Sequence, residues 1–164
     1  MSDQTAPTPQ PPLSGRGSKS ADLPQFLRSR AVFARIAGPR EEIPLLLAHP
    51  EEGWDRAGAA PAKRPVMIWF HGRTVNKELD PGRYLRWLRA AGGGIAACAV
   101  DLPGHGERLD DSLQDSRATL RVVEQAIDEV GSTVRALGDP RWNEAFDTDR
   151  MGIGGMSAGG MVTL

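Results

Sequence analysis

The chain has 164 residues, a formal net charge of −1 at pH 7 and an apolar content of 40%. This length and apolar content suffice for one domain with a buried core, and they exclude a wholly disordered chain. The balanced charge excludes the basic surface that nucleic acids and anionic membranes attract. A small molecule is therefore the expected partner, with no nucleic acid and no membrane.

The compartment and the cofactors follow from what the sequence lacks. The single cysteine, Cys98, cannot form an internal disulfide, and its apolar neighbours predict a buried thiol. No run approaches the roughly 18 apolar residues of a membrane span, and no secretory signal precedes the domain. Neither a complete nucleotide-binding motif nor a metal-ligand spacing of Cys and His is present. The sequence predicts a cytoplasmic protein without cofactor or metal.

The N-terminal part of the chain divides into a tail and a strand pair. Residues 1–30 are rich in Pro and Ser and predict a disordered tail, which leaves residues 31–164 as the folded domain. Two β-like runs, residues 31–36 and 43–48, flank a Gly-Pro turn and predict an antiparallel pair. His49 follows this pair and is expected on the surface.

The middle of the chain alternates strands with helices. The continuous apolar runs at residues 66–70 and 95–100 are typical of strands covered on both faces. Asp80 and Pro81 between them start a helix, so the unit is β-α-β with parallel strands. A third strand is expected at residues 150–154. A long amphipathic helix before it is predicted by a stripe of Leu120, Val123, Ile127, Val130, Val134 and Leu137. The predicted fold is α/β, a mostly parallel sheet with an antiparallel N-terminal strand pair and flanking helices.

A Gly-x-Ser-x-Gly motif at residues 155–159 follows the third strand. A sharp strand-to-helix turn would expose Ser157, the candidate nucleophile, and Gly155 and Gly159 would avoid collisions there. The backbone N–H of Ala158 would then face a developing oxyanion. The alternative is a glycine-rich turn that holds an ordinary serine, and the pentapeptide alone does not decide between the two.

Two further motifs follow the other predicted parallel strands. They are His71-Gly72-Arg73 and Asp101-Leu102-Pro103-Gly104-His105-Gly106-Glu107-Arg108. The three motifs in this order resemble the α/β-hydrolase superfamily. Residues 149–161 are most similar to the esterases of the dienelactone-hydrolase and prolyl-oligopeptidase-like group.

This resemblance implies a serine hydrolase of carboxylesterase type that acts on an ester, thioester or peptide through an acyl-serine. Ser157 would attack, and the backbone N–H groups of Arg73 and Ala158 would hold the oxyanion. The resemblance assigns loop-shaping roles to the remaining motif residues: His71, Gly72, Asp101, His105, Gly155 and Gly159.

The chain departs from this pattern after the serine. The acid and the histidine of the triad should follow Ser157, but residues 158–164 contain neither. We therefore expect a truncated piece of a longer enzyme, inactive or nearly so, whose third strand has a bare edge that favours self-association. Two alternatives stay open. In the first, the chain is a non-catalytic acyl-ligand binding or interaction module built on a hydrolase scaffold. In the second, His105 or His71 replaces the missing base.

Overall fold

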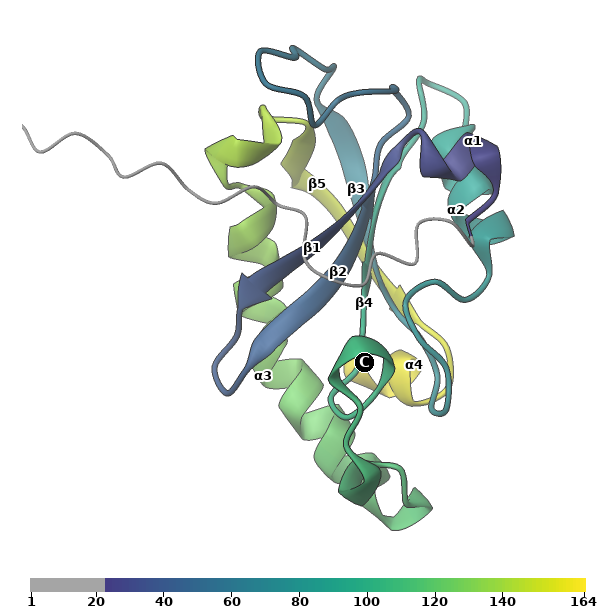
Figure 1. Cartoon of the computed structure of the whole chain (residues 1–164), viewed down its shortest axis with the longest axis vertical. Helices are drawn as coiled ribbons and strands as arrows, with labels where there is room; N and C mark the ends of the chain where they lie inside the picture. Colours follow the sequence, from purple (N-terminus) through teal and green to yellow (C-terminus); the bar gives the residue numbers. More distant parts are fainter. Residues whose placement is uncertain (1–22) are drawn as a thin grey trace, which may run out of the picture.

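The computed structural model describes residues 23–164, which form a five-stranded mixed sheet with helices on both faces (Figure 1). The strands are β1 (Ala31–Ala37), β2 (Glu42–Ala48), β3 (Arg64–Phe70), β4 (Ala96–Val100) and β5 (Phe146–Gly155), in the spatial order β1-β2-β4-β3-β5. The α-helices are α1 (Gln25–Arg28), α2 (Pro81–Leu88), α3 (Thr119–Leu137) and α4 (Ala158–Val162). Short 3₁₀ turns occupy Gly106–Arg108, Asp111–Leu113, Ser116–Ala118 and Pro140–Trp142.

The strand directions confirm the predicted fold class. β2 runs antiparallel to β1 and to β4, whereas β3 runs parallel to both β4 and β5. In the parallel part, Phe70 lies opposite Val100 on one side and Gly155 on the other. The three motifs that follow these strands therefore begin at the same edge of the sheet.

Two apolar layers fill the space between the sheet and the helices. On β4, Ala96, Cys98 and Val100 face the core beneath α3 and α4, whereas Ala97 and Ala99 face the core beneath α1 and α2 (Figure 1). This explains why the run is apolar at every position. Cys98 is buried as predicted, and burial raises the pKa of its thiol to about 12.

The disordered tail predicted for residues 1–30 is wrong at its C-terminal end. Residues 1–22 lie outside the described part of the chain, but Gln25–Arg28 form α1 and Leu27 is fully buried. Leu23 and Leu27 pack in one cluster with Tyr84 and Leu88 of α2. A helix of four residues is too short to leave a periodic pattern in the sequence.

The predicted stripe on α3 is partly wrong. Leu120 and Ile127 are 65% and 49% exposed, although both were expected in the core. The buried face carries small and polar residues as well as apolar ones: Val122, Val123, Ala126, Glu129, Thr133 and Leu137. The buried carboxylate of Glu129 is tolerated because Arg108 pairs with it at 2.7 Å.

The expectation of a surface position for His49 is also wrong. This side chain is fully buried beside Trp54 and Phe146. Its Nε2–H donates to the Ala62 carbonyl at 3.1 Å, and its Nδ1 accepts the Glu51 N–H at 3.1 Å. Both ring nitrogens are therefore satisfied by backbone groups, which permits a neutral histidine in the core.

The bend between β5 and α4 is packed so tightly that its glycines are required. A Cβ on Gly159 would lie 2.2 Å from the Phe70 carbonyl oxygen and 2.4 Å from that of His71. A Cβ on Gly155 would lie 2.1 Å from the Gly159 carbonyl oxygen. These are backbone atoms, so no side chain can move aside to relieve the collision.

Within residues 23–164, no helix has the length and apolar character needed to cross a bilayer.

Adjacent glycines give a matched test of this packing. We expect Gly159→Ala to lower the free energy of unfolding by about 1–3 kcal/mol or more, because the strand ends must separate. In Gly160→Ala the new Cβ finds its nearest neighbour at 3.5 Å, an ordinary contact. That change should be neutral or stabilising by up to about 1 kcal/mol, because alanine favours a helix. Urea unfolding of both variants measures the difference, and equal midpoints would contradict the packing argument.

Candidate active site

Ser157 lies at the bend between β5 and α4 with an unusual backbone conformation. Its φ is 54° and its ψ is −119°, in a region that residues other than glycine rarely adopt, and the side chain is exposed. Hydrogen bonds hold the bend on both sides. The Met156 N–H donates to the Phe70 carbonyl at 3.1 Å, and the Ser157 carbonyl accepts the Met161 N–H at 3.1 Å. Such strain persists only where the surroundings enforce it, and it is concentrated at functional sites.

The loop after β3 contacts this bend. A Cβ on Gly72 would lie 3.4 Å from the Cβ of Ser157, so the Gly72 backbone packs directly against the serine. The guanidinium of Arg73, the next residue, donates to the Gln114 carbonyl and to Thr119 Oγ1. On the other side of Ser157, buried Ala158 is the first residue of α4, where an N–H has no acceptor within the helix.

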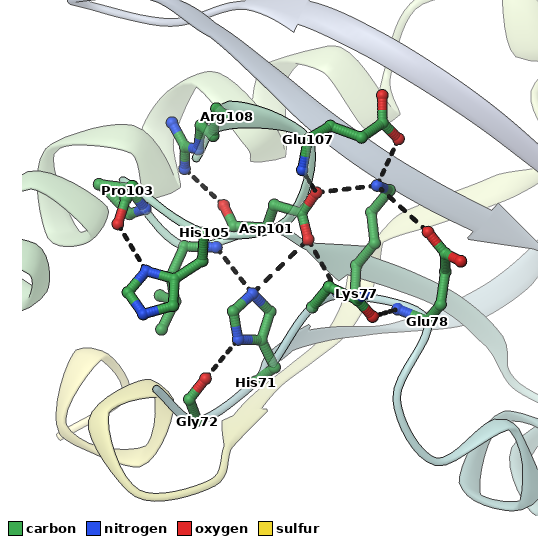
Figure 2. Close-up of polar contacts among 12 residues, drawn as sticks. His71, Gly72, Lys77, Glu78, Asp101, Pro103, His105, Glu107 and Arg108 are labelled. Atoms are coloured by element: carbon green, nitrogen blue, oxygen red, sulfur yellow. Dashed lines mark hydrogen bonds and ion pairs between the residues drawn. The ribbon is translucent and has the colours of Figure 1, made fainter. Parts of the chain in front are cut away.

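His71 is held in one tautomer by its two hydrogen bonds (Figure 2). The Leu102 N–H donates to Nε2 at 3.0 Å, so Nε2 supplies a lone pair and Nδ1 carries the hydrogen. Nδ1–H then donates to the Gly72 carbonyl at 2.5 Å. Because the peptide is planar and trans, the fixed Gly72 carbonyl also fixes the direction of the Arg73 N–H. His71 therefore orients the Arg73 amide, which follows the residue that packs against Ser157.

Asp101 is the centre of a buried polar cluster beneath this loop (Figure 2). Its Oδ1 accepts the Lys77 N–H at 2.8 Å, and its Oδ2 accepts the Lys77 ammonium at 2.8 Å and the Glu107 N–H at 3.0 Å. Burial by itself would raise the pKa of Asp101. The Lys77 ammonium and the Glu107 N–H, which both donate to this carboxylate, outweigh burial and hold that pKa well below its usual range.

The segment that follows Asp101 is shaped around this carboxylate. Gly106 has a φ of 59°, and a Cβ there would lie 2.2 Å from the Asp101 carboxylate. Arg108 donates to the Asp101 carbonyl and makes a bidentate pair with Glu129 at 2.8 and 2.7 Å. One loop thus binds the loop after β3 through Asp101 and binds α3 through Arg108.

Sequence reasoning missed Lys77. This side chain is 1% exposed, and its ammonium binds Glu107 at 2.5 Å in addition to Asp101. A single lysine between a strand and a helix cap has neither periodicity nor motif spacing. Only the structure reveals its partners.

His105 has one free ring nitrogen. Its Nδ1 donates to the Pro103 carbonyl at 2.8 Å, whereas its buried Nε2 has no partner. Burial lowers its pKa, although the Pro103 carbonyl opposes this shift. The ring centroid lies 5.8 Å from that of His71.

The structure does not connect a histidine to the candidate nucleophile. Each of the three histidines contacts backbone groups, and within the described part of the chain none is hydrogen-bonded to the Ser157 hydroxyl. The same residues contain no group of three or more His, Cys, Asp or Glu side chains that could hold a metal ion. The site thus consists of a serine on a strained bend and a backbone loop oriented by a buried polar cluster.

Comparison with known proteins gives matches only among solved structures, because no family model and no curated protein matches the chain. An α/β-hydrolase enzyme from the metagenome of Lake Arreo is 21% identical with a TM-score of 0.56, and the match covers 87% of this chain and 38% of that one. The hyperthermophilic esterase of the archaeon Pyrobaculum calidifontis is 19% identical with a TM-score of 0.55, covering 88% and 39%. A puromycin-hydrolyzing peptidase of Mycobacterium tuberculosis is 21% identical with a TM-score of 0.54, covering 82% and 20%.

These matches cover most of this chain but well under half of each similar structure. At such identities they concern the fold, and they agree with the five-stranded sheet, its strand directions and its helical layers. The chain therefore has part of the α/β-hydrolase fold, the superfamily that its three motifs resemble.

Proposed function

We propose that the chain carries the nucleophile and the oxyanion donors of a serine hydrolase of carboxylesterase type. The observation that supports this most is the backbone of Ser157, which has a positive φ at the carboxyl edge of the sheet and packs against Gly72. A non-glycine residue in such a conformation costs about 1–3 kcal/mol, which a merely structural turn would avoid by using glycine. Similar structures from the hydrolase superfamily support the reaction class.

In the proposed reaction, Ser157 Oγ forms a bond to the acyl carbon of an ester. The carbonyl oxygen becomes negative, and the backbone N–H groups of Arg73 and Ala158 stabilise it. The ester C–O bond then breaks, the alcohol leaves with the serine proton, and water hydrolyses the acyl-serine. An oxyanion donor of this kind is worth roughly 10²–10³-fold in kcat.

Among residues 23–164, no histidine is hydrogen-bonded to Ser157 as its general base. A serine hydroxyl without a neighbouring base is a weak nucleophile, so we expect slow turnover, at best a residual rate, from the chain alone. An activated aryl ester partly compensates for the missing acid, because its leaving group departs without protonation.

Acylation by p-nitrophenyl acetate tests the nucleophile. We expect p-nitrophenol release accompanied by an acetyl group on Ser157, located by peptide mass spectrometry, because this exposed hydroxyl lies on the strained bend against Gly72. Ser157→Ala should abolish the site-specific acetylation, whereas Ser116→Ala, at an exposed serine, should retain it. Equal release by the Ser157→Ala variant, or acetyl groups scattered over surface lysines, would refute the assignment.

A second candidate function is a non-catalytic module that binds acyl ligands. The absence of a hydrogen bond between Ser157 and a histidine in residues 23–164 favours it. Binding of short-chain acyl amides distinguishes this function from the hydrolase. A binding module would bind them without acylation of Ser157, and with the same affinity in the wild type and in Ser157→Ala.

The outer edge of β5 supports a further part of the proposal, association of the chain with itself. Among residues 23–164, β5 pairs only with β3, and Met151 and Ile153 are 38% and 42% exposed. Residues 151–155 contain no proline and no charge, the features that usually protect a free strand edge.

We expect the chain to elute above its monomer mass of 17.7 kDa in size-exclusion chromatography at micromolar concentration. Ile153→Lys places a charge on the free edge and should shift the elution towards monomer. Ile127→Lys changes a similarly exposed isoleucine on α3, 49% against 42%, and is the matched control, with no shift expected. A monomeric wild-type chain under these conditions would contradict the association.

A further inference from the structure

Lys77 is a buried lysine in the same loop between β3 and α2 as Gly72 and Arg73, and Figure 2 shows its ammonium between Asp101, Glu107 and Glu78. Its ammonium lies 2.8 Å from Asp101 Oδ2 and 2.5 Å from Glu107 Oε1. Burying charges costs several kcal/mol per ion, and an apolar side chain of similar volume is often as stable or more so. Stability alone therefore gives a weak reason for a lysine at this position.

The geometry instead shows a residue fixed at three points. The Lys77 N–H and ammonium bind the two oxygens of the same Asp101 carboxylate. The Lys77 carbonyl accepts the Tyr84 hydroxyl at 2.5 Å, which ties it to α2. The loop between β3 and α2 is thus anchored at residue 77, whereas its other end is anchored by the strand itself.

A short path of contacts leads from this anchor to the Arg73 amide. Leu102, which follows Asp101, donates its N–H to His71 Nε2 at 3.0 Å. His71 donates Nδ1–H to the Gly72 carbonyl, whose peptide plane contains the Arg73 N–H. A displaced Asp101 would therefore shift Leu102, release His71 and let the Gly72–Arg73 peptide rotate.

We infer that Lys77 is a positioning residue for the Arg73 amide, because it holds Asp101 and through it the His71–Gly72 contact. The inference rests on the proposed function, in which that amide stabilises the oxyanion. Lys77 acts through Asp101 and His71, and makes no hydrogen bond to the bend at residues 155–159.

The charges around Asp101 determine how the effect of replacing Lys77 depends on pH. The carboxylate faces the Lys77 ammonium, the Glu107 N–H and His71 Nε2, which lies 3.6 Å from Oδ1. The Glu107 and Glu78 carboxylates lie 2.5 and 3.8 Å from the same ammonium, the Arg108 guanidinium binds the Asp101 carbonyl, and the His105 ring centroid lies 5.8 Å from that of His71. In the wild type the low pKa of Asp101 keeps it ionised down to acid pH. Without the Lys77 ammonium the remaining burial raises the pKa of Asp101, so the variant protonates and loses the anchor as pH falls.

The test uses Lys77→Met, which keeps most of the length of the side chain and removes its charge. Lys63→Met, at an exposed lysine, is the matched control. The measured quantity is the maximal rate constant of Ser157 acylation by p-nitrophenyl acetate, normalised to the amplitude of p-nitrophenol release. In Lys77→Met this rate constant should fall on the order of 10–100-fold. The ester concentration for half-maximal rate should stay constant. The deficit relative to wild type should grow as the pH is lowered from about 8 to about 5.5, since burial without the Lys77 ammonium favours the protonated form of Asp101. Lys63→Met should match the wild type.

A second measurement decides the inference without relying on acylation. The imidazole ¹⁵N shifts of His71 should report the Nδ1–H tautomer in the wild type and a mixture in Lys77→Met, with faster amide exchange at residues 72–77. If Ser157 of the wild type is not acylated, the proposed function fails while this measurement still decides the positioning role. An unchanged tautomer together with unchanged exchange would overturn it.

Lys77→Arg covers the case in which Lys77→Met does not fold. It keeps the positive charge beside Asp101, so its acylation rate relative to the wild type should be independent of pH. If the acylation rate of Lys77→Arg relative to the wild type falls as the pH is lowered, the inference is contradicted. An imidazole spectrum of His71 that is unchanged in both Lys77→Met and Lys77→Arg also contradicts it.

Discussion

The close approach of the β5–α4 bend to the end of β3 is the constraint on which the rest of the site depends. Because Phe70 and Gly155 are in register, the chain leaving β5 must turn beside the loop that leaves β3. Backbone atoms of Gly159 then meet the carbonyl oxygens of Phe70 and His71 with no room for a Cβ. The space that remains forces Ser157 into its positive φ and brings it against Gly72. Strand register therefore determines where the hydroxyl is presented.

The buried charged side chains of the segment after β4 are a second constraint on the site. Asp101 binds the loop after β3, and Arg108, seven residues later, binds Glu129 of α3. The glycine at position 106 is needed because the carboxylate occupies the place of its Cβ. The same short segment thus joins the sheet edge to both the loop after β3 and the long helix α3. Each ion is paired, which is the condition under which buried charge is tolerated.

The sequence predicted the parts of the fold that depend on local pattern. Continuous apolar runs identified β3 and β4, Asp80 and Pro81 identified the start of α2, and the Gly-x-Ser-x-Gly spacing located the bend. It failed where a distant partner decides the outcome. Glu129 is buried only because Arg108 reaches it, His49 is buried because Ala62 and Glu51 satisfy its ring, and Lys77 depends on Asp101. Such pairings have no spacing that a single sequence can display.

The same network bears on whether a histidine of this chain could act as the base. His71 would have to give up Leu102 and Gly72 to accept a proton from Ser157, and that would release the peptide that orients the Arg73 amide. The two roles exclude each other, so a His71 that orients the amide is not also the base. His105 keeps a free Nε2, but this nitrogen is buried and has no contact with the hydroxyl within residues 23–164. In the proposed reaction, orientation of the Arg73 amide and activation of the serine are therefore separate tasks, and among residues 23–164 the structure shows contacts for the first alone.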